Sequence, residues 1–343
     1  MATIKEVARR AGVSVGTVSN VMTGSVTVSS DLKHRVNAAV RELHYRPNHV
    51  ARSLKTRQTK TIGMIISDIT NPFYPQMVRG AEDAALQHHY MLVTFNTDDR
   101  VEREDQVLAE LSSRKMDGLL LVIAQHRTDM RPLLALHHAG MPIVCLDRVN
   151  PGLPFDSVTV NNAKGSQDCV QHLIALGHRR IAAVTGNLSV GIGRERFRGY
   201  KTALREAGIE LTDELVAVGE FRQSTAYDTT IRLLSLPPER RPTAIFSANS
   251  LMTLGVLRAL EEKGVSCPQD IALATFDDLT LANAFRPHLT SVAQPTYEIG
   301  YRGAELLIER LRNEVVDETP RHVRMHTELR IRESTAAYPG ERR

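Results

Sequence analysis

From Thr61 onward the sequence alternates short apolar runs with longer amphipathic stretches, and this alternation constrains the fold more than any other feature. The apolar runs predict buried strands, whereas the stretches between them carry apolar residues at helical spacing. The first set is expected to place strands at 61–66, 90–95, 118–123 and 142–146, with helices near 73–88, 101–113 and 129–138. Such alternation is typical of a parallel sheet wound by right-handed crossovers.

A second set of the same kind follows, so the chain is predicted to be an α/β protein whose body has two similar lobes. Its strands are expected near 180–184, 215–218, 243–247 and 271–275, and its helices near 161–176, 195–207, 223–235 and 250–263. The body would span 61–335, with an N-lobe at about 61–160 and 291–320, a C-lobe at about 161–290 and 321–335, and a tail at 336–343. Ligands of open α/β sheets bind at the carboxyl ends of strands, so we expect a pocket between the lobes.

Positive charge is concentrated in the first part of the chain. Residues 1–60 hold eleven Lys or Arg against three Asp or Glu, a net of +8, and since the whole chain carries +4, the rest carries −4. A basic head on an acidic body is what we expect of a protein that binds the phosphates of DNA. On charge alone, a basic face that is merely solvated remains an alternative.

The head is predicted to contain three short helices. Thr3 and Glu6 can form a capping box for a first helix that ends at Gly12. Ser14 can cap a second helix, and a third is expected from about residue 30 to 43. This spacing is that of a helix-turn-helix, although a small helical bundle without any role at DNA has the same pattern.

The third helix should be broken at Arg46-Pro47-Asn48, so the head is expected to span 1–47. Residues 48–60 offer one or two helical turns with too little apolar surface to fold alone. We therefore predict a hinge helix and linker there that are ordered only by binding.

Three stretches carry a more specific signal, and they begin at Thr3, Tyr45 and Thr61. They read T-I-K-E-V-A-R-R-A-G-V-S-V-G-T-V-S-N-V, then Y-R-P-N-H-V-A-R-S-L-K, then T-I-G-M-I-I-S-D-I-T-N-P-F-Y. In this order and spacing they closely resemble the lactose-repressor/galactose-repressor (LacI/GalR) family of bacterial transcription regulators, from residue 2 to about 335. The resemblance implies a periplasmic-binding-protein-like body in a homodimeric repressor. It also implies near-palindromic double-stranded operator DNA and a small-molecule effector, a sugar or sugar derivative, as partners.

The resemblance also assigns roles in DNA binding. Val15, Gly16 and Asn20 would face bases of the major groove, whereas Ser14, Thr17 and Tyr45 would lie close to the DNA backbone. Leu54 would be a hinge wedge that unstacks a minor-groove base step, with Arg52 and Lys55 placed to hold phosphates or the groove. Gly16 departs from the family, where a side chain often reads a base, so base readout is expected to depend on Val15 and Asn20.

Polar residues recur where the expected strands end, and several can serve as ligand contacts or as helix caps. The strand-end residues are Ser67-Asp68, Asn96, Asp147-Arg148, Asn249 and Asp277-Asp278. By the resemblance, the effector-binding residues are Phe73, Asp147, Arg196, Phe221, Asn249 and Asp277. The polar ones suit vicinal hydroxyls and the phenylalanines can cover an apolar ring face, although both rings can equally be core residues. A purine held against Phe221 and the pair Phe73-Tyr74 is the alternative effector.

By the same resemblance, the helix that begins near Pro72 and continues through Met77 and Ala81 would form part of the dimer face. The glycine-rich run at 186–194 lacks the Lys-Ser/Thr ending of a phosphate-binding loop and is expected to be a loop at the cleft. The sequence has no nucleophile elbow and no zinc spacing, so we predict neither an enzyme nor a cofactor or metal.

Export and membrane insertion are not expected. The sequence shows no apolar core of signal-peptide length and no membrane-spanning apolar run, and its three cysteines lie far apart, which fits reduced thiols in a cytoplasm. A DNA-architectural protein would not need so large a clamp-like body, and an exported solute-binding protein would lack the basic head. Both rival classes therefore fit the chain less well than a cytoplasmic DNA-binding regulator with no membrane partner.

Overall fold

The computed structural model describes residues 2–23, 28–45, 58–150, 152–188, 191–278, 286–312 and 319–338. The chain divides into two compact units, Met1–Thr59 and Lys60–Arg343. Most of the expected hinge helix lies outside the described residues. No helix in the described part is long and apolar enough to cross a membrane.

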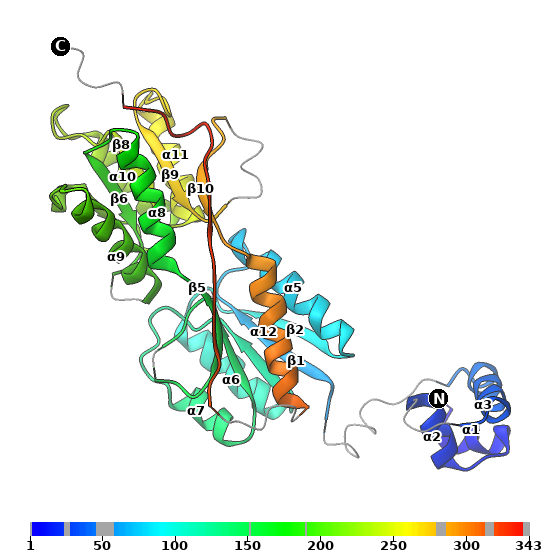
Figure 1. Ribbon diagram of the computed structural model, residues 1–343. Helices are drawn as coiled ribbons and strands as arrows, with labels where there is room; N and C mark the ends of the chain where they lie inside the picture. The colour runs from blue at the N-terminus through cyan, green and yellow to red at the C-terminus, as the bar shows by residue number, and fades with distance from the viewer. Residues whose placement is uncertain are drawn as a thin grey trace. The chain divides into compact units, whose positions relative to one another are not determined.

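The first unit contains the three expected helices, α1 (Ile4–Ala11), α2 (Val15–Thr23) and α3 (Ser30–Glu42) (Figure 1). The capping box is present: the Glu6 amide donates to Thr3 Oγ1 at 3.4 Å, and the Thr3 amide donates to Glu6 Oε2 at 2.7 Å. Gly12 ends α1 in the left-handed conformation, with a φ of 64°. Arg35 of α3 donates to the carbonyls of Ala11 and Gly12, so this cation holds the turn between α1 and α2.

The second unit contains two six-stranded sheets, each covered by helices. The N-lobe holds β1 (Thr61–Ile66), α5 (Phe73–Gln87), β2 (Met91–Asn96), α6 (Val101–Ser113), β3 (Gly118–Leu121), α7 (Arg131–His138), β4 (Ile143–Leu146), β5 (Asp156–Val160), α12 (Thr296–Leu311) and β11 (His322–Met325). The C-lobe holds α8 (Asn162–Ala175), β6 (Ile181–Thr185), α9 (Gly191–Glu206), the 3-10 helix η1 (Asp213–Leu215), β7 (Val216–Val218), α10 (Gln223–Leu234), β8 (Ala244–Ser247), α11 (Ser250–Glu262), β9 (Ala272–Phe276), β10 (Thr290–Ala293) and β12 (Glu328–Arg330).

The two sheets have the same strand arrangement, which confirms the predicted fold class. Their orders are β11-β5-β4-β3-β1-β2 and β12-β10-β9-β8-β6-β7, and the pairings are parallel except for that of β12 with β10. In each sheet the strand order reverses at one point, beside β1 in the N-lobe and beside β6 in the C-lobe. Ligands of such sheets bind at the carboxyl ends of the strands near this point.

The lobe boundaries differ from those expected near 291 and 321. β10 pairs with β9 and therefore belongs to the C-lobe, whereas β11 pairs with β5 and belongs to the N-lobe. The chain thus returns to the N-lobe between β10 and α12, and it crosses again between β11 and β12. Strands this short and polar carry little periodicity, so the sequence pattern placed each boundary a few residues too early.

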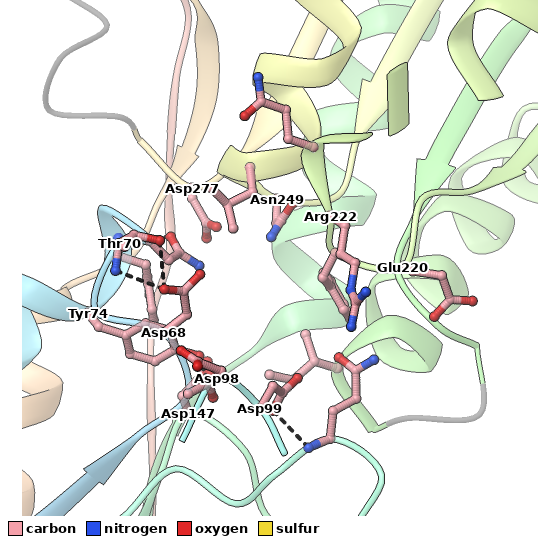
Figure 2. A pocket seen from close by; sticks show the side chains of 18 of the residues that line it. Asp68, Thr70, Tyr74, Asp98, Asp99, Asp147, Glu220, Arg222, Asn249 and Asp277 are labelled. Atoms are coloured by element: carbon pink, nitrogen blue, oxygen red, sulfur yellow. Dashed lines mark hydrogen bonds between the residues drawn. The ribbon is translucent and has the colours of Figure 1, made fainter. Parts of the chain in front are cut away.

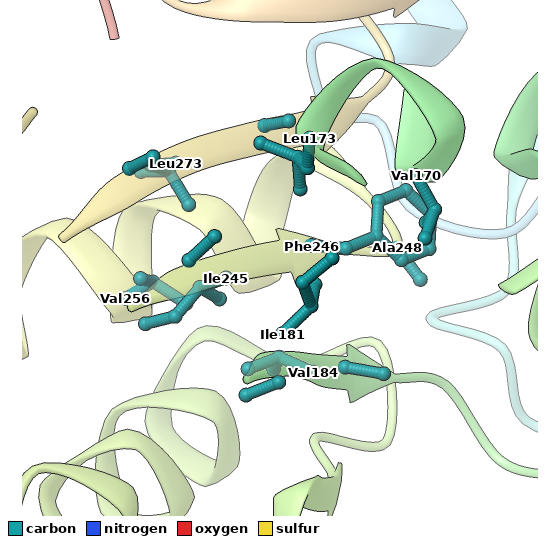
Figure 3. Close-up of a cluster of buried hydrophobic side chains, with 14 of the residues drawn as sticks. Val170, Leu173, Ile181, Val184, Ile245, Phe246, Ala248, Val256 and Leu273 are labelled. Atoms are coloured by element: carbon teal, nitrogen blue, oxygen red, sulfur yellow. The ribbon is translucent and has the colours of Figure 1, made fainter. Parts of the chain in front are cut away.

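Each sheet has an apolar core on both faces. In the C-lobe, Val170 and Leu173 of α8 pack on one side of Phe246, and Val256 of α11 packs near Ile245 on the other (Figure 3). All of these side chains are buried, which explains why the central strands read as continuous apolar runs.

The helices α5 and α12 pack closely through two glycines. A Cβ at Gly80 would lie 2.0 Å from the Tyr297 carbonyl oxygen, and one at Gly300 would lie 1.8 Å from the Met77 carbonyl oxygen. Met77 and Ala81 are therefore fully buried within the chain. These two side chains therefore do not contribute to a dimer face, and a dimer contact of α5 would have to use the exposed side of this helix.

The last part of the glycine-rich run at 186–194 is helical and not the expected loop, since α9 begins at Gly191. A Cβ at Gly193 would lie 2.2 Å from the Asn187 carbonyl oxygen. This glycine therefore permits a close backbone contact inside a helix, and the sequence pattern alone had indicated a loop.

Candidate effector cleft and DNA-binding head

A cavity of about 920 Å³ lies between the lobes and receives residues from both (Figure 2). All six predicted effector residues line it: Phe73, Asp147, Arg196, Phe221, Asn249 and Asp277. Figure 2 shows Asp147 on the N-lobe side of the cavity, across from Asn249 and Asp277. The structure thus brings together residues that lie up to 204 positions apart in the sequence.

The N-lobe wall is built on an arginine that is already paired. Arg148 donates to Asp99 Oδ1 at 2.6 Å and to the Ile123 carbonyl at 3.3 Å, and it lies 3.5 Å from the Tyr74 hydroxyl. Tyr74 in turn donates to Ser67 Oγ at 3.2 Å. These contacts tie the ends of β1, β2 and β4 to the first turn of α5.

The Asp147 carboxylate lies beside Arg148 but, in the described part of the chain, has no hydrogen-bond partners of this kind. Within the described residues no hydrogen-bond donor contacts its carboxylate, and the nearest cation is Arg148 Nε at 3.9 Å. Only 7% of the residue is exposed. Burial raises the pKa of Asp147 to about 6, although Arg148 and Arg196 partly offset the effect. This buried carboxylate is therefore an acceptor that a ligand can fill.

The C-lobe wall contains a carboxylate that is already bonded. Asp277 accepts from Gln294 Nε2 at 2.6 Å and from the Ser250 amide at 3.3 Å, and it lies 3.8 Å from Arg196 Nη2. The Gln294 Oε1 atom is buried and has no hydrogen-bond partner among the described residues. Gln294 follows β10 directly, so it lies where the chain crosses between lobes.

Arg196 is held rigidly inside α9. It donates to Asn162 Oδ1 at 2.8 Å and to the Ala248 carbonyl at 2.6 Å, and its guanidinium lies 3.7 Å from the centre of the Phe276 ring. A buried guanidinium fixed in this way is an oriented donor, which suits hydroxyl or carboxylate oxygens.

The remaining predicted effector residues have structural roles as well. Asn249 Oδ1 caps α11 by accepting from the Met252 amide at 2.9 Å, so both of the roles considered for this residue fit the structure. Phe73 and Phe221 are half-buried against the lobe cores while also lining the cavity. The Phe221 ring lies against Gly186, where a Cβ would be 2.0 Å from its Cζ atom.

The rings of Phe73 and Tyr74 meet edge to face, at an interplanar angle of 81°. Tyr74 is also buried. The purine alternative, in which this pair and Phe221 hold a base, depends on the spacing across the cavity and is not decided by this angle.

Backbone strain is concentrated at the cavity. Among the described residues, ten non-glycine residues have a positive φ, and six of these line the cavity. They are Asp98, Asp99, Asp147, Glu220, Phe221 and Asp277. Such conformations cost about 1–3 kcal/mol each and are typical of functional sites.

Beyond the six expected effector residues, the cavity is lined by others that the sequence pattern did not assign to the effector, among them Asn71, Tyr74, Arg148 and Gln294. Arg148 was noted only as a strand-end neighbour of Asp147. Its pairing with Asp99 follows from two strand ends that meet at one edge of the sheet, so the parallel order could have indicated it. Gln294 follows a strand that was not expected, so no local signal pointed to it.

The head presents its predicted DNA-binding residues as follows. Ser14 Oγ accepts from the Thr17 amide at 3.1 Å and caps α2. Val15 is 42% exposed and Gly16 is exposed, whereas Asn20 and Tyr45 are half-buried. A Cβ at Gly16 would meet only Ser14 Oγ, at 3.6 Å, so the helix surface there has room for a side chain. The predicted roles of Arg52, Leu54 and Lys55 concern residues outside the described part of the chain.

Two parallel-sheet lobes around a polar cavity, on a chain with a helix-turn-helix head, define a ligand-responsive DNA-binding regulator. Residues 3–48 match the family described as bacterial regulatory proteins, lacI family, and residues 170–335 match the periplasmic binding protein-like domain. The chain is 39% identical to the ribose operon repressor of Escherichia coli (strain K12) over 91% of this chain and 93% of that protein. The chain therefore belongs to the lacI family of bacterial regulatory proteins.

Two solved structures are similar over most of their length. The lac repressor dimer bound to operator and the anti-inducer ONPF superposes with a TM-score of 0.84 at 28% identity, covering 98% of this chain and 99% of that one. A LacI-family transcriptional regulator from Enterococcus faecium with bound ribose gives a TM-score of 0.73 at 29% identity, covering 81% of this chain and 99% of that one.

Proposed function

We propose that the protein is a homodimeric repressor whose head binds operator DNA and whose cleft binds a small sugar that controls this binding. The observation that carries the proposal is the meeting of buried charges from both lobes in one cavity, on a chain with a basic helix-turn-helix head. A ligand that contacts Asp147 and Asp277 together has different affinities for open and closed lobes. Differential affinity of this kind is what allostery requires.

We further propose that the sugar is a pentose such as ribose. A neutral polyol can donate hydroxyl groups to Asp147 and to Gln294 Oε1 while it accepts from Arg196, and Phe73 and Phe221 can cover its apolar faces. The relative that is 39% identical is a ribose operon repressor, and one of the similar structures holds ribose. A purine held against Phe221 and the pair Phe73-Tyr74 is the alternative effector.

The proposed dimer uses the exposed edge of the N-lobe. Leu86 at the end of α5 is 60% exposed and Met91 at the start of β2 is 63% exposed, and β2 is an edge strand whose side chains are only partly covered. An exposed apolar edge is a liability unless a partner covers it. A twofold dimer through this edge would match a near-palindromic operator, and it uses the exposed end of α5, the helix in which a dimer contact is expected from the sequence.

In the head, we propose that Val15 and Asn20 contact base edges, Gly16 allows close approach, and Ser14, Thr17 and Tyr45 lie at the DNA backbone. Leu54 would wedge a base step at the operator centre, between the phosphate contacts of Arg52 and Lys55. As a DNA-bound repressor the protein would act in the bacterial cytoplasm, and neither catalysis nor a cofactor is needed for this function.

The test combines operator binding with thermal unfolding. The protein should shift a near-palindromic fragment upstream of the genes that it neighbours, and ribose at about 100 times its dissociation constant should add about 2.7 kcal/mol to the free energy of unfolding. A Leu54→Ala variant should keep its melting temperature and its dimer while losing most specific binding. Absence of any specific fragment, with and without ribose, would contradict the repressor assignment.

A further inference from the structure

One exposed stripe of α9 carries four cations and no acid, because the exposed Glu206 lies off this stripe and accepts from Gln167 and Gln171. Arg194, Arg198, Lys201 and Arg205 follow one another at intervals of four, three and four residues, so they form one stripe along the helix, here called the α9 stripe. The buried face, with Arg196, lies on the opposite side of the helix. Within the described part of the chain, no carboxylate lies within ion-pair distance of any of the four.

Other helices of the body place opposite charges at this spacing. Arg79 pairs with Asp83 on α5 at 3.2 Å, Glu110 pairs with Arg114 at the end of α6 at 2.8 Å, and Lys164 pairs with Asp168 on α8. Such pairs stabilise a helix, whereas like charges at the same spacing destabilise it. The like charges of the α9 stripe therefore lower the stability of the helix. A helix face that contacts only solvent does not need such a cluster, and the body as a whole carries a net charge of −4.

A groove runs beside the stripe. It measures about 610 Å³, and Arg198, Lys201 and Arg205 line it together with Leu204, Ile209 and Leu211. Leu211 is 38% exposed, which is unusual for a leucine in this chain. One wall of the groove is thus basic, and the other is largely apolar but also carries the exposed Glu210. None of these residues lines the effector cleft.

We propose that the α9 stripe and its groove form a docking surface for an acidic, apolar-faced segment of another protein. The cations match carboxylates on one helical face, and arginine, which supplies three of the four, binds carboxylates bidentately. The apolar wall distinguishes this surface from a phosphate-binding one, because contacts to a nucleic-acid backbone need cations and polar groups only. Ile209 and Leu211 would cover apolar side chains of the partner segment.

The probe is a fluorescein-labelled helical peptide with glutamates at i, i+4, i+7 and i+11 and leucines along the adjacent face. Anisotropy is measured with the full-length protein at about 0.15 M salt. A reference peptide has glutamine in place of glutamate. We expect binding of the acidic peptide and at least about tenfold weaker binding of the reference peptide.

Variants locate the surface. The triple change Arg198→Glu, Lys201→Glu and Arg205→Glu should weaken peptide binding by more than about tenfold. The matched control is Arg179→Glu, Arg232→Glu and Lys263→Glu, three exposed cations elsewhere on the C-lobe, and it should change binding by less than about threefold. Leu211→Ser should weaken binding by about threefold to tenfold through lost apolar contact. Melting temperature and ribose binding report whether each variant is folded.

Three outcomes overturn the proposal. If the two triple variants weakened peptide binding equally, the peptide would be attracted by the net charge of the protein and not by the α9 stripe. Full competition by a duplex without operator sequence would identify a nucleic-acid surface. A dimer that dissociates when the α9 stripe is reversed would assign the surface to a second copy of this chain.

Discussion

The two walls of the cleft hold their carboxylates in different ways. On the C-lobe wall, Asp277 accepts from Gln294 and the Ser250 amide and lies close to Arg196 before any ligand is bound. On the N-lobe wall, Arg148 is taken by Asp99, and Asp147 is left buried without a hydrogen-bond donor in the described residues. One wall is therefore preorganised, whereas the carboxylate of the other wall faces the cavity without a protein donor among the described residues.

This difference indicates what a ligand must supply. An ionised carboxylate that is buried without donors is unfavourable, and donated hydrogen bonds remove that cost. A ligand rich in hydroxyl groups can satisfy Asp147 while it uses the fixed donors of the C-lobe. Binding then draws the N-lobe wall toward the C-lobe wall, which links the effector to lobe closure.

The largest expected effect comes from the preorganised wall. Arg196→Met removes two hydrogen bonds from a buried guanidinium and leaves Asp277 with less compensation, so the free energy of unfolding should fall by about 3 kcal/mol. Ribose affinity should fall by more than about 100-fold. Urea unfolding and calorimetric titration measure these effects.

Arg205→Met on the exposed face of α9 is the control and should change stability by less than about 0.5 kcal/mol. Retained ribose binding in Arg196→Met would show that this wall does not orient the ligand.

Asp147→Asn tests the other wall and should have opposite effects on stability and affinity. Burial raises the pKa of Asp147 to about 6 from its usual 3.8, so the folded state holds this proton more tightly than the unfolded state. The wild type therefore loses stability as the pH rises between these two pKa values. The variant lacks that loss and should be more stable than the wild type by about 1–3 kcal/mol at pH 8 without ligand. Ribose affinity should nevertheless fall about 10-fold to 100-fold, because the amide offers one acceptor oxygen in place of two. A variant less stable than the wild type at pH 8 would contradict the unpaired state of Asp147.

The pH dependence of ribose binding gives a smaller effect. If the ligand donates to ionised Asp147, affinity should rise by up to about tenfold between pH 5 and pH 7.5, as the carboxylate with a pKa of about 6 loses its proton. Asp147→Asn should give a flat profile in the same titration. A rising profile that persists in this variant would assign the titration to another group.

Tyr74→Phe should have the smallest effect. Its hydroxyl donates to Ser67 and lies at the long distance of 3.5 Å from Arg148, which Asp99 already holds. Ribose affinity should change by less than about threefold, with a loss of about 1 kcal/mol in the free energy of unfolding. A large loss of affinity would mean that Tyr74, and not Asp99, holds the N-lobe wall in place.

Most of the fold could be predicted from local patterns. The three head helices, the central strands and the helices between them agree with the sequence within a few residues, because continuous apolar runs and capping residues are local signals. β5, β10, β11 and β12 were not expected. They are short or lie at the later crossings, and they are recognisable only by the strands with which they pair.

The cleft could be predicted in its residues but not in its bonding. All six expected effector residues line one cavity, since strand ends and family motifs are visible in the sequence. The sequence does not show that Asp277 is bonded and Asp147 is not. That depends on Gln294 and Asp99, which reach the site from other strands. Likewise, the burial of Met77 and Ala81 could not be read from the sequence, because the packing of α12 on α5 is a long-range contact.

The central claim is that occupancy of this cleft controls DNA binding by the head. The most direct measurement is the operator affinity of the full-length dimer, by anisotropy at fixed salt, with and without saturating ribose, in the wild type and in Asp147→Asn. Ribose should change the wild-type affinity by about 5-fold to 150-fold and leave that of the variant unchanged at the same ribose concentration. If ribose bound the wild type without altering its operator affinity, the proposed coupling of cleft and head would be contradicted.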